Sequence, residues 1–211
     1  KIIYLSIYMN KNRDIINKIN NFFHEIPLVA YIIPYLMHLC STSYLLYGEP
    51  HKYTHKDPLY DIIINNTPNL SKYHYLINYI MLILLIPFLI NPKLDYFISI
   101  FKYVSIIIFF ILLTTSVTIL PSCEKDHCKL QNNYLNYIIG HCNDKIFSGH
   151  TSVSLILLYL IYNYDLVDTN VFYFLIFIQI LIALLLIVTK GHYTIDVLLG
   201  YFITGTILLL V

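Results

Sequence analysis

Long apolar runs alternate with polar connections along most of the chain. A helix rises about 1.5 Å per residue, so about 20 apolar residues cross the roughly 30 Å hydrocarbon layer of a bilayer. Apolar runs of near this length cover residues 26–47, 75–91, 97–120, 149–164, 171–189 and 193–211. They lack the alternation of membrane β-strands. We therefore predict an all-α, polytopic membrane protein, a bundle of six transmembrane helices spanning 26–211 behind a polar segment at 1–25.

The polar connections indicate which helix ends share a side of the membrane. Two connections are long, at residues 48–74 and 121–148, and a third is the short turn at 190–192. In a six-span topology two crossings separate each of these connections from the next. All three are therefore expected on the same side, and any reactive side chains they carry are expected to meet there.

Composition supports a membrane location and excludes one class of partner. Hydrophobic residues make up 58% of the chain and charged residues 12%, and the mean hydropathy is +0.67. These values lie beyond those of soluble globular domains. The net charge is only +1, and no cluster of Lys and Arg suggests a nucleic-acid partner. The expected partner is the bilayer itself, and an oligomer is compatible with the sequence.

One candidate for chemistry is the segment 191–196, which reads G-H-Y-T-I-D. His192 and Asp196 are four positions apart, so on a helix their side chains lie on one face within reach of a hydrogen bond. A carboxylate in that place fixes the imidazole tautomer and raises the basicity of the other ring nitrogen. We predict His192 as a nucleophile and Asp196 as the group that orients it.

The second candidate is the segment 142–151, which reads C-N-D-K-I-F-S-G-H-T. Ser148 and Gly149 open the fourth predicted span, where backbone N–H groups and the helix dipole favour a phosphate. A histidine beside such a phosphate can protonate a leaving alkoxide and deprotonate an incoming hydroxyl. His150 is therefore predicted as the general acid and base.

Both segments resemble motifs of the sphingomyelin synthase family, a branch of the type 2 phosphatidic acid phosphatase superfamily. The family's motif C-G-D-x3-S-G-H-T is matched, with Asn143 in place of glycine, at Cys142, Asp144, Ser148, Gly149, His150 and Thr151. Its motif H-Y-T-x-D-V-x3-Y is matched at His192, Tyr193, Thr194, Asp196, Val197 and Tyr201.

Weaker similarity extends toward the amino terminus. The sequence P-L-Y-D at 58–61 resembles the family's P-L-P-D, and V-T-I-L-P at 117–121 resembles its V-T-T-L-P. The resemblance therefore covers most of residues 55–205. It departs at Ile111, where the family carries an arginine, and at Val211, where the chain stops before the family's aromatic tail. Both departures bear on headgroup and donor selectivity.

The resemblance implies an enzyme that transfers phosphocholine from phosphatidylcholine to ceramide, giving sphingomyelin and diacylglycerol. It implies His150, His192 and Asp196 as catalytic residues, a histidine phospho-intermediate, and no metal or cofactor. It also implies cytosolic termini and a site on the lumenal or exoplasmic face of the Golgi or plasma membrane. Lysines are slightly more numerous on the predicted site side, which opposes that orientation.

Secondary roles follow for other residues of the two motifs. Asp144 is expected to orient His150 or bind the choline ammonium, or else to be a solvated loop carboxylate. Ser148 and Gly149 are expected at the phosphate. The remaining motif side chains are expected to shape the substrate pocket, namely Tyr193, Thr194 and Tyr201.

The other cysteines and histidines receive structural interpretations. Cys123, Cys128 and Cys142 share one site-side loop, where a lumenal location would permit a disulfide, most simply between Cys123 and Cys128. A zinc site with His127 or His141 is an alternative, although the spacing matches no standard ligand pattern. The remaining histidines are interpreted as structural or solvated, namely His24, His38, His51, His55 and His74.

Several other functions use the same residues. The headgroup product could be ceramide phosphoethanolamine or inositol phosphorylceramide, or phosphatidylcholine made from diacylglycerol by a cholinephosphotransferase. A lipid phosphate phosphatase would pass the intermediate to water, but the K-x6-R-P signature of such phosphatases is absent from the sequence. An inactive membrane scaffold would retain only the bundle.

Overall fold

The apolar runs form helices whose bounds lie within a few residues of the predicted spans. The computed structural model describes residues 15–19, 21–22, 25–47, 57–118, 120–121, 123 and 146–210. None of these residues lies in a β-strand. The helices are η1 (Leu28–Tyr31), α2 (Ile32–Tyr47), α3 (Ile62–Asn66), η3 (Ser71–Tyr73), α4 (Leu76–Ile90), α5 (Leu94–Val117), α7 (Gly149–Asn163), α8 (Thr169–Val188) and α9 (Thr194–Leu210). The all-helical fold class is confirmed for this part of the chain.

Hydropathy and length mark some of these helices as membrane spans. Within the described ranges, three helical stretches are long and apolar enough to cross a bilayer: Ser71–Ile90, Leu94–Thr115 and Thr169–Val188. Leu28–Cys40 and Thr194–Leu210 are shorter apolar helices. A membrane protein is therefore supported, whereas a crossing by all six predicted spans stays a prediction.

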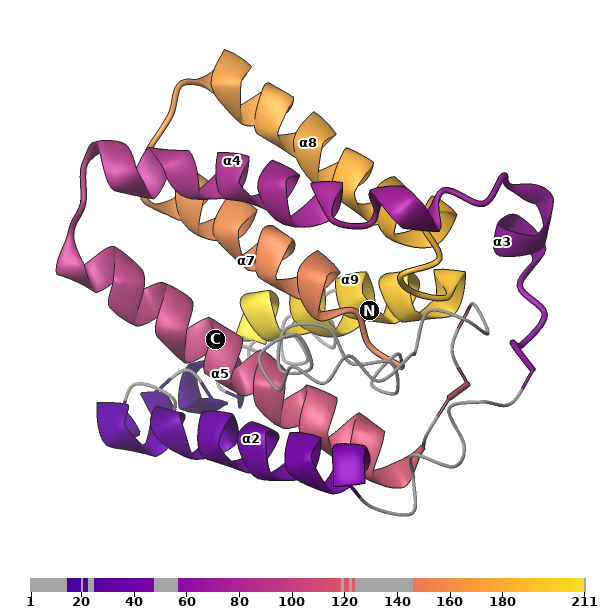
Figure 1. Ribbon diagram of the computed structural model, residues 1–211. Coiled ribbons are helices and arrows are strands. Elements are labelled where there is room, and N and C mark those ends of the chain that lie inside the picture. Colours follow the sequence, from indigo (N-terminus) through magenta and orange to yellow (C-terminus); the bar gives the residue numbers. More distant parts are fainter. Residues whose placement is uncertain are drawn as a thin grey trace, which may run out of the picture.

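Helix α7 is the central element of the bundle. It packs against α4, α5, α8 and α9, while α2 packs on α5 and α4 on α8. Figure 1 shows that α4, α7 and α9 begin at the end of the bundle where α5 and α8 finish. The first residues of three helices are thereby gathered at one end, which we call the site end.

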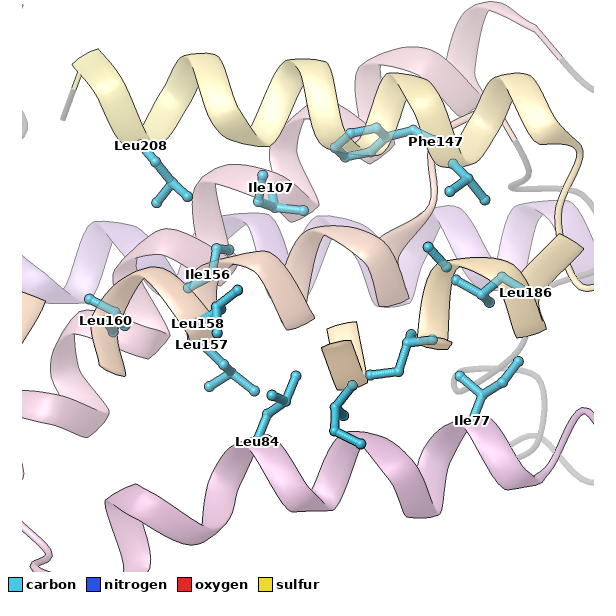
Figure 2. Packing of buried hydrophobic residues seen from close by; sticks show 14 of the residues in the cluster. Ile77, Leu84, Ile107, Phe147, Ile156, Leu157, Leu158, Leu160, Leu186 and Leu208 are labelled. Carbon is cyan, nitrogen blue, oxygen red and sulfur yellow. The ribbon is translucent and has the colours of Figure 1, made fainter. Parts of the chain in front are cut away.

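The interior and the exterior of the bundle are both apolar. Figure 2 shows part of the interior cluster, in which Leu84 of α4 points toward Leu157 of α7, and each of these side chains is at most 1% exposed. Large apolar side chains also cover the outside, among them Leu82, Leu89, Phe177, Leu184, Phe202 and Leu209. An apolar exterior of this kind suits contact with lipid chains better than contact with water.

Small residues bring α7 and α9 close together at the site end. A Cβ added to Gly200 of α9 would lie 3.2 Å from both the Ser148 carbonyl oxygen and Thr151 Cβ. The Ser148 N–H also donates to the Asp196 carbonyl oxygen at 3.2 Å. Close backbone approach through small residues is characteristic of helix packing in membranes. It fixes the start of α7 against the first turn of α9.

Candidate active site

His192 lies in the tight turn that joins α8 to α9. Lys190, two residues after the end of α8, lies in the left-handed region with φ of 55°. The N–H groups of Gly191 and His192 both donate to the Leu186 carbonyl oxygen, at 2.9 and 3.1 Å. Such a left-handed residue followed by bonds back into the last turn is a common helix ending. His192 therefore sits before the first residue of α9, with only 8% of its surface exposed.

Asp196 is fully buried in the first turn of α9 beside His192. Its Oδ2 accepts a hydrogen bond from the Tyr193 N–H at 3.0 Å and lies 3.8 Å from His192 Nδ1. The second distance suits an ion pair but exceeds a hydrogen bond. The hydrogen bond expected from helical spacing is not formed, because His192 precedes the helix and the carboxylate caps its amino terminus instead.

His150 lies in the first turn of α7, next to His192. The ring centroids of the two histidines are 6.4 Å apart, with the rings inclined at 64°. Ser148 caps this helix, and its hydroxyl oxygen accepts from the Thr151 N–H at 3.3 Å and from the Thr151 hydroxyl at 3.0 Å. The structure thus brings together the two histidines singled out by the motifs, although their catalytic roles stay a prediction.

Two residues at the start of the second predicted span, His74 just before it and Asn78 within it, join this site, and the sequence motifs did not include them. Asn78 Oδ1 lies 3.1 Å from His150 Nε2, and the ring centroids of His74 and His150 are 6.3 Å apart. His74 was interpreted as structural or solvated from the sequence, yet it lies in the site. A signal was present, because His74 and Asn78 are one helical turn apart at the site-side end of an apolar run.

The first turn of α9 is held by side chains and backbone from two distant loops. The Tyr193 hydroxyl accepts from the Leu59 N–H at 3.0 Å and donates to the Pro121 carbonyl oxygen at 3.1 Å. Asp61 accepts from the Thr194 N–H at 2.7 Å and from the Thr194 hydroxyl at 2.9 Å. The segments that resembled the family's P-L-P-D and V-T-T-L-P therefore converge on the residues that follow His192.

The residues predicted to shape the pocket are bonded within the protein. The side chains of Tyr193 and Thr194 make the hydrogen bonds given above. The Tyr201 hydroxyl donates to Gln179 Oε1 of α8 at 2.8 Å. Ser148 is fully buried as a helix cap. These bonds give the side chains positioning roles, and contact with substrate stays a prediction for each of them.

Ile111 occupies the position at which the resembled family carries arginine. Its side chain faces the start of α7, since a Cβ added to Gly149 would lie 3.5 Å from Ile111 Cδ1. Ile111 is 9% exposed. Ile111 of α5 therefore presents an apolar side chain to this side of the site.

Some predicted residues lie outside the described part of the chain. Asp144 is one, and so are the disulfide and zinc candidates Cys128, Cys142, His127 and His141. Cys123 is described and buried. Among the described residues, no group of three or more His, Cys, Asp or Glu side chains is placed to hold a metal ion.

Comparison with known proteins finds a family model that matches the carboxyl-terminal part of the chain. Residues 141–211 match the family model PAP2 superfamily C-terminal. The match supports the type 2 phosphatidic acid phosphatase superfamily, whose members are lipid phosphatases and phosphotransferases, and so supports an enzyme. No curated protein matches the chain. The matched region, which we call the PAP2 region, contains His150, His192 and Asp196.

Asp61 is one of the links between the PAP2 region and the rest of the bundle. Its carboxylate caps α3, accepting from the N–H groups of Ile63 and Ile64, as well as binding Thr194 of α9. Burial raises the pKa of Asp61, but the hydrogen bonds from Thr194, Ile64 and Ile63 outweigh it, and the net effect lowers the pKa below its usual 3.8. The ionised form is therefore favoured by folding.

This lowered pKa predicts a pH-dependent stability. The unfolded chain binds the Asp61 proton more readily than the folded chain, so the stabilising contribution is complete above about pH 4 and is lost as the pH falls through the folded pKa. Asp61→Asn should lower the free energy of unfolding by about 1 kcal/mol near pH 7, because hydrogen bonds to a charged acceptor are stronger than those to an amide oxygen. The difference in thermal midpoint from the wild type, followed by circular dichroism in detergent, should shrink below pH 4. An equal difference at both pH values would contradict this account.

Gly191 of the PAP2 region makes room for His74. A Cβ at this position would lie 2.3 Å from His74 Cε1 and 2.7 Å from His74 Nδ1. Gly191→Ala should therefore lower the thermal midpoint by displacing the His74 ring. In a His74→Ala background the same change should cost much less, because only the tight 3.3 Å contact with the Leu186 carbonyl oxygen remains. An equal loss in both backgrounds would show that the ring does not occupy this space.

Proposed function

We propose that this chain transfers phosphocholine from phosphatidylcholine to ceramide, producing sphingomyelin and diacylglycerol through a phosphohistidine intermediate. The observation that carries the proposal is the 6.4 Å separation of the His150 and His192 rings, with Asp196 Oδ2 3.8 Å from His192 Nδ1. Two imidazoles this close can act on opposite sides of one phosphorus atom. The superfamily match supports lipid phosphate chemistry at these residues.

In the first half-reaction, His192 is the nucleophile. Its Nδ1 is on the side of the buried Asp196 carboxylate, so Nε2 is the nitrogen that attacks phosphorus. The bond between phosphorus and the glycerol oxygen breaks, and the departing alkoxide takes a proton from the His150 imidazolium, leaving as diacylglycerol. The Asp196 carboxylate stabilises the positive charge that develops on His192.

In the second half-reaction, ceramide occupies the place of diacylglycerol. Neutral His150 takes the proton from the primary hydroxyl of ceramide as its oxygen attacks phosphorus. The bond between phosphorus and His192 Nε2 breaks, and sphingomyelin is released. Because His150 regains the proton it gave up, one site can exchange two lipid alcohols without net proton transfer.

The first turn of α7 suits the phosphate of a lipid headgroup. Amides in the first turn of a helix have no partners within the helix, and the helix dipole there favours negative charge. In α7 this turn contains His150, and it lies at the site end, where α4, α7 and α9 begin. A headgroup held at a helix end leaves its acyl chains beside the apolar exterior. We place this end on the lumenal or exoplasmic face of a Golgi or plasma membrane.

The proposal is tested by assaying all acceptors with one labelled donor. Proteoliposomes containing the full chain receive choline-labelled phosphatidylcholine together with ceramide, diacylglycerol or no added acceptor. Labelled sphingomyelin in the ceramide arm is the expected product. Labelled free phosphocholine in every arm would instead identify a hydrolase. Label found only in phosphatidylcholine that carries the acyl chains of the added diacylglycerol would identify diacylglycerol as the acceptor. Donors with ethanolamine or inositol headgroups test the alternative transferases in the same format.

A further inference from the structure

His74 forms a third imidazole at the site, and neither the motifs nor the family match includes it. Its ring centroid lies 6.3 Å from that of His150, which lies 6.4 Å from that of His192. His74 also lies against Gly191, the residue immediately before His192. His74, in the segment that leads into α4, therefore lies close to both motif histidines.

The surroundings of His74 fix its tautomer. The Thr189 hydroxyl donates its hydrogen to the Leu185 carbonyl oxygen at 2.6 Å, so its oxygen can only accept at the 3.1 Å contact with His74 Nδ1. Nδ1 of His74 therefore carries a proton. The ring edge formed by Nδ1 and Cε1 lies against Gly191. With Nδ1 protonated, Nε2 is the nitrogen at which this ring gains or loses a proton.

A phosphoryl group carries negative charge, which cationic N–H donors close to it stabilise. Ile111, which faces the start of α7, is apolar. The Lys72 ammonium lies 4.8 Å from the centre of the Tyr73 ring, in a cation–π contact on the exposed side of η3. A protonated His74 would add one charge and one N–H donor close to His150.

We propose that His74 binds a non-bridging oxygen of the transferred phosphoryl group through Nε2–H, so that three imidazoles surround the phosphorus. This inference deepens the proposed function and rests on it for the identity of the ligand. Thr189 and Gly191 act as positioning residues for the His74 ring. The site takes a phosphate ester that carries one or two negative charges.

Two substitutions of His74 separate anion binding from packing. His74→Phe keeps an aromatic ring against Gly191 and beside His150 but has no nitrogen, whereas His74→Gln loses the ring and keeps an N–H donor. Orthovanadate, a phosphate analogue, is titrated into each purified full-length variant and followed by ⁵¹V line broadening. Anion binding predicts that Phe weakens vanadate affinity about tenfold or more and that Gln recovers part of it. Wild-type affinity in the Phe variant would overturn the proposal.

A second measurement needs no substitution at His74. With ¹³C at histidine Cε1 of the wild-type chain, orthovanadate should shift three histidine resonances. A shift of only two would remove His74 from the anion site. The donor assay on the wild type is run in parallel. If it yields no labelled product although three resonances shift, the proposed function fails while the three-histidine anion site stands. If labelled product forms although only two resonances shift, the proposed function stands and the role of His74 in anion binding fails.

Discussion

His192→Ala is expected to lower headgroup transfer by at least about a thousandfold, because it removes the atom that forms the phospho-intermediate. The fold should survive the change. The turn around His192 is held by backbone bonds to Leu186, and the first turn of α9 is held through Tyr193 and Thr194. Rates of sphingomyelin formation in proteoliposomes test the first expectation, and helix content by circular dichroism tests the second.

A matched control for this change is His38→Gln. His38 is a half-buried histidine of α2, a helix that packs on α5. Its replacement should leave the transfer rate within about twofold of the wild type, as is usual for substitutions away from a site. Retention of activity by His192→Ala would remove His192 from the mechanism, and an equal loss in His38→Gln would attribute the effect to the bundle as a whole.

Asp196→Asn is expected to lower the rate by about a hundredfold to ten-thousandfold, the range seen when an orienting carboxylate is neutralised beside a histidine. The amide oxygen can still accept the Tyr193 N–H that now bonds to Oδ2. The change therefore removes the charge next to His192 Nδ1 while retaining the helix cap. We expect kcat to fall with little change in KM, because the carboxylate acts on charge that develops during the reaction.

Asp168→Asn is the matched control for Asp196→Asn. Asp168 is exposed and caps α8, accepting from the N–H groups of Asn170 and Val171 at 3.0 Å. It lies where α8 begins, away from the site end in Figure 1. Both variants lose a capping carboxylate, but only Asp196→Asn should lose transfer activity. A similar loss of activity in both variants would assign the effect to capping and not to His192.

The helices were predictable because hydropathy alone determines where a chain can enter a membrane. The fourth predicted span, 149–164, matches α7 at its first residue, since Ser148 provides both a capping side chain and the end of the polar loop. The other helix starts were predicted less accurately. The predicted span at 97–120 begins at Leu94 in α5, where Lys93 precedes the helix without a side-chain cap.

The site was predictable only where a sequence motif carried it. His150 and His192 were found through two short segments, and the structure places their rings 6.4 Å apart. His74 and Asn78 were missed because they belong to neither motif, and their spacing of one helical turn does not indicate which residues they meet. Their partners are His150, Thr189 and Gly191, which lie more than seventy positions away and meet them only through helix packing.

The supporting bonds of the site could not be predicted from local patterns either. Asp61 and Pro121 were noted as parts of weakly similar segments, without any role. Their function depends on tertiary contacts, since Asp61 caps α9 across 133 positions and the Pro121 carbonyl accepts from the Tyr193 hydroxyl across 72. The i, i+4 spacing of His192 and Asp196 predicts a hydrogen bond only if both residues lie in a helix. His192 precedes α9, and the two side chains are 3.8 Å apart.

Direct trapping of the phospho-intermediate tests the central claim. The full chain is incubated with phosphatidylcholine labelled in the phosphate, without an acceptor, and is then denatured in base, because phosphohistidine is labile in acid. Mass spectrometry of the peptides should place a phosphocholine adduct on His192, with the diacylglycerol released in equal amount. The adduct should disappear when ceramide is added and should be absent from His192→Ala. An adduct on His150, or turnover without any covalent intermediate, would contradict the account.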